Sequence, residues 1–475
     1  MIDGFDALWE QARPAFGQER TWRRARTLAL SALVGLGRHT ITGLLTASAQ
    51  QGLDWSAAYR LFEQERFDGT ALFAPARREV GARLGERDPL VVLMDDTLVR
   101  KRGRTVHGTG WKRDPLGPAF CSNFVWGQRF LQLSAALPEG TGPCRSRGIP
   151  IDVRHCPSPR KPGKREPPEA WAAYRRLQEQ MKVSTAGADR IKDVRAAMDA
   201  EAQNRERPLI VSVDGAYTNR SVFRDLPPNT TLIGRVRKDA RLFLPPPRDV
   251  KPRRGRRPWY GDPLPTPEQI RQDETVPWTT VNAWAAGKVH GFEVKTLEAV
   301  RWAGTGDRDA RLVVIRPLAY RPRQGARLLY RHPVYLLCTD PGLPVETLLQ
   351  AYLWRWEIEV NFRDEKTVLG MGEAQVRTPE AVAAVPRLMA AAYAFLLLAG
   401  AGSTPATGGL PLPKWRKEDP KGRPSTPRLV GQLRAQLWGK GMGLNLTHFV
   451  NNTPGNANHD KIADALPSAV CYAFR

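Results

Sequence analysis

Two apolar segments that each end in carboxylates place the strongest constraint on the fold of this 475-residue chain. Residues 89–94 lead into Asp95 and Asp96, and residues 209–213 lead into Asp214. Continuous apolar runs of this length predict buried strands. Because open α/β sheets place ligand-binding groups at the carboxyl ends of their strands, we expect an α/β core with acids gathered at one edge. A turn or a helix N-cap is the alternative interpretation of the Asp95–Asp96 pair.

A third candidate acid lies in residues 351–377, which predict one helix because no Gly or Pro occurs before Gly370. Four side chains with spacings of three, four and seven residues fall on one face of this helix: Tyr352, Arg355, Glu359 and Lys366. A carboxylate flanked by phosphate-binding groups suits a metal site. The alternative is a solvated face on which Glu359 pairs with Arg355 and Arg363 at i,i+4 spacing.

The charge of the chain indicates a polyanionic partner. With 72 Lys and Arg against 48 Asp and Glu, the net charge is +24 and the pI is about 10.3. Nucleic acid is the partner that such a charge favours, although a basic protein without a polyanionic partner remains the alternative. Basic clusters follow the first strand and occur again in the middle of the chain: Lys101, Arg102, Arg104, Arg253, Arg254, Arg256 and Arg257.

Several other classes of protein are disfavoured. The five cysteines are scattered and contain no CxxC pair, which argues against a zinc site and suits reduced thiols. The N-terminus lacks the pattern of a signal peptide. Residues 381–402 are apolar but contain Pro386 and Arg387, so they predict a buried helix rather than a membrane span. We expect a cytoplasmic, nucleoid-associated protein with no membrane contact.

The pattern divides the chain into five regions. Residues 1–85 predict helices, as a DNA-binding module or a packing domain, and residues 86–237 predict the first part of the core. Residues 238–330 predict a β-rich insertion, residues 331–402 the second part of the core, and residues 403–475 a basic region for DNA contact or dimerisation. Within the core, residues 124–137 predict a strand pair, residues 138–168 an exposed loop and residues 166–206 charged helices.

One motif resembles a known family. The spacing Tyr352-x2-Arg355-x3-Glu359-x6-Lys366 is similar to the signature of bacterial insertion-sequence transposases of the DDE class, of the cut-and-paste type. The segment NFRDEKTVLGMGEAQVRTPEA around it, DDT at residues 95–97, VDGAY at 213–217 and RRGRRP at 253–258 also resemble these enzymes.

The resemblance implies a ribonuclease H-like (retroviral integrase-like) catalytic core with a β-rich insertion. It implies that Asp96, Asp214 and Glu359 bind two Mg²⁺ ions, with Mn²⁺ as a substitute. Asp96 is preferred over Asp95 because the catalytic Asp of the family directly precedes Thr. Tyr352, Arg355 and Lys366 are then expected to contact DNA phosphates, and either Trp284 or Trp302 to hold a flipped base, unless these tryptophans are core residues.

The implied function is transposition. A homodimer in the synaptic complex would bind double-stranded inverted repeats, cleave the ends by two-metal hydrolysis and join the 3′-OH ends to target DNA. Two alternatives remain open. One is a ribonuclease H-like DNA nuclease or resolvase without strand transfer, and the other is a non-catalytic DNA-binding protein derived from a transposase.

Overall fold

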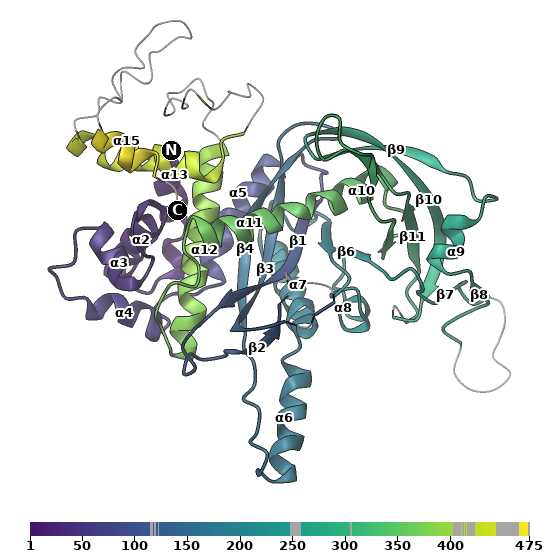
Figure 1. Cartoon of the computed structure of the whole chain (residues 1–475), viewed down its shortest axis with the longest axis horizontal. Coiled ribbons are helices and arrows are strands. Elements are labelled where there is room, and N and C mark those ends of the chain that lie inside the picture. The colour runs from purple at the N-terminus through teal and green to yellow at the C-terminus, as the bar shows by residue number, and fades with distance from the viewer. Residues whose placement is uncertain are drawn as a thin grey trace, which may run out of the picture.

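A large mixed sheet, with helices on both faces, forms the centre of the computed structural model (Figure 1). The structure describes residues 1–114, 117, 120–121, 123–247, 258–304, 306–401, 410, 413, 415, 423–442 and 465–473. The prediction of an α/β protein is therefore confirmed within these ranges.

The core of the sheet is built around strand β1, which is paired on both sides. β1 lies between β3, which is antiparallel to it, and β5, which is parallel to it. β4 pairs with β3 and β6 with β5. The bounds of these strands are β1 (Leu90–Arg100), β2 (Gly110–Arg113), β3 (Phe124–Pro138), β4 (Ser146–Cys156), β5 (Leu209–Val213) and β6 (Thr230–Arg235). Parallel neighbours β1, β5 and β6 thus bring their carboxyl ends to one edge of the sheet.

Two local predictions in this region are wrong. Residues 124–137 form one long strand rather than a strand pair, and the expected exposed loop contains β4, most of whose residues are buried. The polar residues of β4 made this strand hard to predict from the sequence, because the side chains that bind them belong to distant parts of the chain. Asp152, for example, accepts two hydrogen bonds from Arg190, at 2.6 and 2.7 Å.

The predicted β-rich insertion continues the same sheet. Strand β14 (Val334–Cys338) pairs with β6 on one side and with β11 on the other, and the order continues through β10 to β7 and β8. The bounds here are β7 (Leu242–Phe243), β8 (Pro263–Leu264), β9 (Thr279–Ala285), β10 (Lys288–Trp302), β11 (Ala310–Ile315), β12 (Ala319–Tyr320) and β13 (Leu329–Tyr330). The strands on both sides of the proposed division at residue 330 therefore belong to one sheet.

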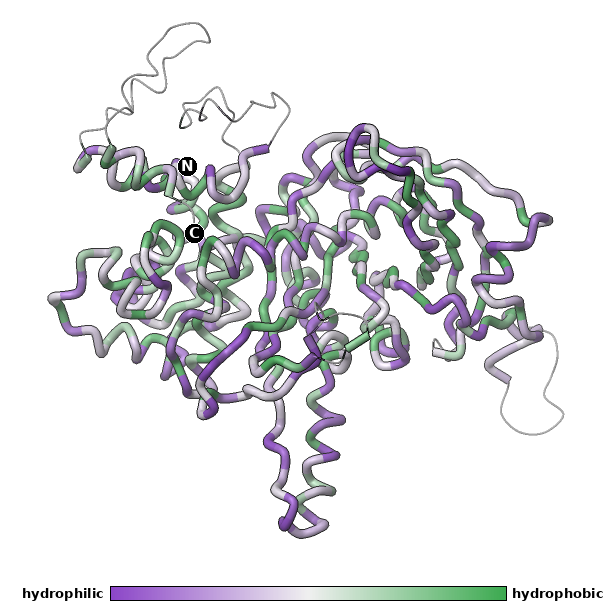
Figure 2. The backbone as a smooth tube through the Cα atoms, viewed as in Figure 1, coloured by the Kyte–Doolittle hydropathy of each residue, from purple (hydrophilic) through white to green (hydrophobic). Residues whose placement is uncertain are grey.

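The helices of residues 1–85 surround a long apolar helix from the other end of the chain. Helix α12 (Pro379–Ala401) contacts α1, α2, α4 and α5 of this region, and Figure 2 shows its apolar character. Helix α12 is long and apolar enough to cross a membrane, but 89% of its most apolar stretch is buried inside the structure. The bounds are α1 (Ile2–Gln11), α2 (Glu19–Val34), α3 (Ile41–Ala47), α4 (Ser56–Glu63) and α5 (Ala74–Arg83).

The remaining helices lie over the sheet or beyond its edge. Short 3₁₀ turns η1 (Arg13–Ala15), η2 (Ala71–Phe73) and η4 (Lys440–Met442) complete the described elements. The helix bounds are α6 (Pro168–Gln180), α7 (Val183–Ala200), α8 (Arg220–Arg224), α9 (Pro267–Gln272), α10 (Val345–Trp354), α11 (Trp356–Thr367), α13 (Thr426–Trp438) and α15 (Ala465–Cys471).

Candidate active site

The two faces of β1 have different surroundings. Val91 and Leu93 belong to a buried cluster with residues of α10 and α11, whereas Val92 and Met94 belong to a cluster that contains Tyr217. Successive side chains of a strand point to opposite faces. The side chain of Asp95 therefore lies on the face of the sheet that α10 and α11 cover, and the side chain of Asp96 lies on the opposite face.

Asp95 lies in a strongly perturbed environment. Its side chain is largely buried and accepts a hydrogen bond from Arg355 Nη1 at 3.0 Å. Burial, and next the charge of Asp214, raises the pKa of Asp95 from 3.8 to about 7, although Arg355 opposes the shift. A buried carboxylate beside a second carboxylate is an environment in which a bound cation is favourable.

Asp96 is bound to a different partner. Its carboxylate accepts a hydrogen bond from Tyr217 Oη at 2.6 Å and lies 3.3 Å from Arg129 Nε. Burial, and next the charge of Asp96, raises the pKa of the Tyr217 phenol. The geometry thus places Asp95 rather than Asp96 beside Asp214 on the face covered by α11. The sequence-based preference for Asp96 rests on the neighbouring Thr97 and stays a prediction, whereas the alternation of side chains along β1 favours Asp95 as the acid beside Asp214.

Asp214 stands directly after β5, at the same level as Asp95 on β1, since Met94 pairs with Val213. Its carboxylate accepts a hydrogen bond from the Ala216 backbone N–H at 2.8 Å, and its carbonyl accepts one from Thr218 Oγ1 at 2.9 Å. These two bonds form a tight turn that fixes Asp214 at the carboxyl edge of the sheet.

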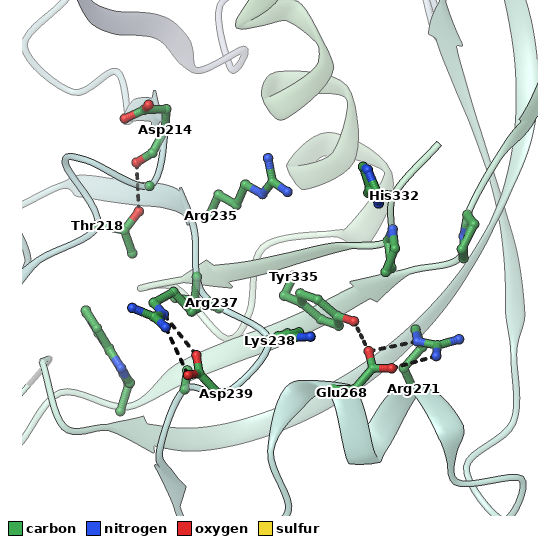
Figure 3. A pocket seen from close by; sticks show the side chains of 16 residues that line it. Asp214, Thr218, Arg235, Arg237, Lys238, Asp239, Glu268, Arg271, His332 and Tyr335 are labelled. Carbon is green, nitrogen blue, oxygen red and sulfur yellow. Dashed lines mark hydrogen bonds and ion pairs between the residues drawn. The ribbon is translucent and has the colours of Figure 1, made fainter. Parts of the chain in front are cut away.

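A cavity of about 990 Å³ opens beside Asp214 (Figure 3). At its far end Glu268 is bound to Arg271 Nη2 at 2.6 Å, and Arg237 pairs with Asp239 at 2.9 Å. Arg235 and Lys238, which also line it, are exposed and form no ion pair with a described residue. The sequence analysis did not select these cations, although the basic segment RVRK at residues 235–238 begins at the last residue of β6 and carried the signal. Their charges are therefore available to an anion that enters this cavity.

The expected single helix of residues 351–377 is two helices that meet at Arg355. The backbone N–H of Arg355 donates to Tyr352 and that of Ile358 donates to Arg355, so i→i+3 bonds replace the α-helical pattern there. Helix α10 therefore ends at Trp354 and α11 begins at Trp356. This short irregularity lies at the residue that reaches across to Asp95.

Glu359 lies one helical turn beyond Arg355, about 6 Å farther along the axis at 1.5 Å per residue. Arg355 binds Asp95, and Arg363 Nε donates to Asp364 at 2.9 Å, so both proposed i,i+4 partners of Glu359 are engaged elsewhere. Glu359 is exposed and forms no hydrogen bond or ion pair with a described residue. The interpretation of this stripe as an ion-paired surface is therefore wrong.

The other two members of the stripe lie on either side of this junction. The guanidinium of Arg355 lies 6.0 Å from the centre of the Tyr352 ring, which is half-buried. Lys366 Nζ lies 6.0 Å from the Phe362 ring, and burial lowers the pKa of this lysine while Glu365 and Glu359 raise it. Tyr352 thus lies beside Arg355, and Lys366 lies close enough to Glu359 to be influenced by its charge.

The described residues do not include an assembled group of three or more His, Cys, Asp or Glu side chains able to hold a metal ion. Asp95 and Asp214 nevertheless provide the hard oxygen donors that Mg²⁺ prefers. Burial, and next the charge of Asp214, raises the pKa of Asp95, and a bound cation would oppose both effects. The pair therefore offers the donors that a divalent metal prefers, while Glu359 on the adjoining helix is exposed and does not form a group of three acids with them in this structure.

Comparison with known proteins gives one match. The family model described as DDE superfamily endonuclease matches residues 13–308, more than half of the chain. No curated protein matches. This chain belongs to the DDE superfamily endonucleases. The match includes Asp95, Asp96 and Asp214 and ends before Glu359. It supports a nuclease of the DDE transposase type that acts on DNA, and enzymes of this superfamily generally use divalent metals.

The basic loop after β1 contains two kinds of residue. Lys101 Nζ donates to the carbonyls of Gly372, at 2.5 Å, and Ala374, at 3.3 Å, and burial lowers its pKa to about 8. Arg102 and Arg104 are exposed. Lys101 thus ties the loop to the segment after α11, and the two arginines remain available for DNA. The predicted contacts Arg253, Arg254, Arg256 and Arg257 lie outside the described residues.

The two candidate tryptophans of the endonuclease occupy different places. Trp302 lines the cavity beside Asp214 and packs edge-on against Phe223, with ring centres 5.6 Å apart. Trp284 lies on β9, and its backbone exchanges two hydrogen bonds with the Gln350 side chain, at 2.8 and 3.2 Å. Only Trp302 of the two lies at the described cavity next to the acids.

Proposed function

We propose that this endonuclease is a DNA transposase that cleaves the inverted-repeat ends of an insertion sequence and joins their 3′-OH ends to target DNA. The main support is the signature Tyr352-x2-Arg355-x3-Glu359-x6-Lys366, whose Arg355 binds Asp95 and whose Glu359 is left without a partner among the described residues. The net charge of +24 supports a DNA substrate.

A ribonuclease H-like core is part of this proposal. The strand order β4-β3-β1-β5-β6 combines three antiparallel strands with two further strands parallel to β1. This order supports such a core, with the strands of residues 238–330 as the insertion. The helices of residues 1–85 and the basic C-terminal region are proposed to bind DNA or to mediate dimerisation in the synaptic complex.

The catalytic acids are proposed to be Asp95, Asp214 and Glu359. They would hold two Mg²⁺ ions, or Mn²⁺, which when bound activate a water or a 3′-OH and stabilise the leaving oxygen. Asp96 would instead orient β1 and Tyr217 on the opposite face. Arg355 holds the Asp95 carboxylate with one of its five N–H groups, which leaves donors for a DNA phosphate.

Tyr352 and Lys366 are proposed to bind phosphates on either side of the scissile bond. Lys366 supplies a positive charge two helical turns after Glu359, and Tyr352 supplies a hydroxyl from the end of α10. Arg235 and Lys238 would hold the strand that passes Asp214 into the neighbouring cavity, with Trp302 as the flat surface for an unstacked base.

The test is a joining assay. Labelled linear DNA that carries the ends of the element is incubated with the protein, Mg²⁺ and a supercoiled target. We expect joined products with the wild type and with Asp96→Asn at reduced yield, but none with Asp95→Asn or Glu359→Gln. Cleavage without joining would instead indicate a nuclease or resolvase, and binding without cleavage would indicate a non-catalytic DNA-binding protein.

A further inference from the structure

Helix α6 stands away from the rest of the molecule. None of its 13 residues is buried, and Figure 1 shows it projecting beyond the sheet. An isolated helix of this length is marginally stable in water, because helices in proteins are stabilised mainly by packing an apolar face. A projecting helix without such packing is suited to binding a partner.

The position of this arm, residues 157–182, follows from the strand register. Arg129 of β3 pairs with Leu98 of β1 on one side and with Cys156 of β4 on the other, so β1 and β4 run parallel and end at the same edge. The arm begins directly after Cys156, and its Ser158 N–H donates to the Gly108 carbonyl at 3.1 Å. It therefore leaves the sheet at the edge that carries Asp95 and Asp214, next to the basic loop after β1.

The charge of the arm is strongly positive. It contains three glutamates against seven exposed cations: Arg160, Lys161, Lys164, Arg165, Arg175, Arg176 and Lys182. Among the described residues, only Lys182 of these seven forms an ion pair, with Glu179 at 2.5 Å. Six exposed cations on a narrow projection repel one another and favour an anionic partner.

The aromatic residues of the arm are already in contact with one another. Trp171 and Tyr174 pack edge-on with ring centres 6.2 Å apart, and Lys161 Nζ lies 5.7 Å from the Trp171 ring. The Tyr174 hydroxyl accepts a hydrogen bond from Gln178 at 2.8 Å. Only Leu177 and Met181 remain as exposed large apolar side chains, which is too small an apolar surface to favour a protein partner.

We propose that residues 157–182 form an arm that binds the phosphate backbone of duplex DNA beyond the scissile bond, without reading its bases. This inference rests on the proposed action on DNA. Thirteen helical residues span about 20 Å, which corresponds to about six base pairs. The arm thus contacts about six base pairs of duplex on one side of the acids. These contacts increase the affinity for DNA independently of its base sequence.

The experiment measures binding separately from cleavage. The quadruple variant K164Q/R165Q/R175Q/R176Q removes four charges, and glutamine preserves helix propensity. Duplex affinity is measured by fluorescence anisotropy in EDTA over a series of salt concentrations. We expect affinity at low salt to fall about 10–100-fold and the slope of log K against log salt to become shallower by about 2–4, since each phosphate contact contributes about 0.9.

The matched control is E169Q/E179Q, which alters the charge of the same arm in the opposite sense and should bind DNA as tightly as the wild type or more tightly. Shortening the duplex by about six base pairs on one side should weaken DNA binding by the wild type and leave DNA binding by the quadruple variant unchanged.

Unaltered affinity and salt slope in a quadruple variant with wild-type circular dichroism would overturn the proposal. A lost dimer in light scattering together with unaltered DNA binding would overturn it in favour of a second copy of the chain. A protein that binds DNA through the arm but does not cleave it would contradict the proposed function and still support the role of the arm in binding.

Discussion

Asp95 and Asp96 are neighbours in the chain but occupy opposite faces of the sheet. Asp95 is held by Arg355 and repelled by Asp214, whereas Asp96 is held by Tyr217 and Arg129. On one face the acid is held in an environment that disfavours its charge, and on the other the charge is satisfied by donors. The contrast suggests different roles, since a carboxylate held among donors stabilises the fold, whereas a buried carboxylate beside a second acid favours the uptake of a cation.

The largest expected effect is on DNA cleavage. Asp95→Asn should lower the cleavage rate by about 10³-fold or more, because it removes a charged ligand from the metal site. The measurement is single-turnover cleavage of labelled terminal-repeat DNA in Mg²⁺. The matched control is Asp96→Asn, which should lower the rate less than about tenfold. Equal losses in the two variants would remove the functional distinction between the faces.

The second expected effect is on stability without metal. The folded-state pKa of Asp95 is raised from 3.8 to about 7. Its stabilising contribution is therefore present below about pH 4 and lost as the pH rises to about 7. In EDTA at pH 8, Asp95→Asn should be more stable than the wild type by about 1–3 kcal/mol, and the difference should vanish near pH 4.

Urea unfolding of both proteins between pH 4 and 8 measures this difference. Asp96→Asn serves as the comparison, because losing a satisfied carboxylate should destabilise the fold at pH 8. A wild type that is more stable than Asp95→Asn at pH 8 without metal would mean that Arg355 outweighs burial and the repulsion from Asp214.

The third expected effect is stabilisation by metal on the Asp95 face alone. Mg²⁺ at ten times its dissociation constant should raise the free energy of unfolding of the wild type by about 1.4 kcal/mol. Thermal unfolding with increasing Mg²⁺ should show this shift for the wild type and Asp96→Asn, and no shift for Asp214→Asn. A shift that survives in Asp214→Asn would place the cation elsewhere.

The smallest expected effect comes from the opposite face. Tyr217→Phe removes the 2.6 Å hydrogen bond to Asp96 and keeps the packing of the ring, so it should lower the free energy of unfolding by about 1 kcal/mol. Cleavage should stay within about threefold of the wild type, as measured by the same single-turnover assay. If Tyr217→Phe lost nearly as much cleavage activity as Asp95→Asn, the residues on the Asp96 face would take part in catalysis directly.

The sequence predicted the strands that carry the acids, and the structure adds that Asp95 rather than Asp96 lies on the face of Asp214. Both faces of β1 are covered, so residues 90–94 are uniformly apolar and lack the alternation that would reveal the parity of Asp95. That parity depends on contacts with α10 and α11, more than 250 residues later in the chain.

Other features were hidden for similar reasons. Charged residues in β4 are satisfied by distant partners such as Arg190, and the junction at Arg355 contains neither Gly nor Pro. The candidates Asp214 and Glu359 were selected from a strand end and from a motif, because those signals are local, and their role stays a prediction. Long-range pairing instead decides how the strands of residues 238–330 extend the core sheet.

The central claim is that Asp95, Asp214 and Glu359 share a divalent metal site, with Asp96 outside it. Anomalous diffraction from crystals grown with Mn²⁺ and a DNA end tests it most directly, because it locates the metal without relying on activity. We predict a peak between the carboxylates of Asp95 and Asp214, with Glu359 as a further ligand. A peak bound by Asp96 in place of Asp95, or no peak beside Asp214, would contradict the account.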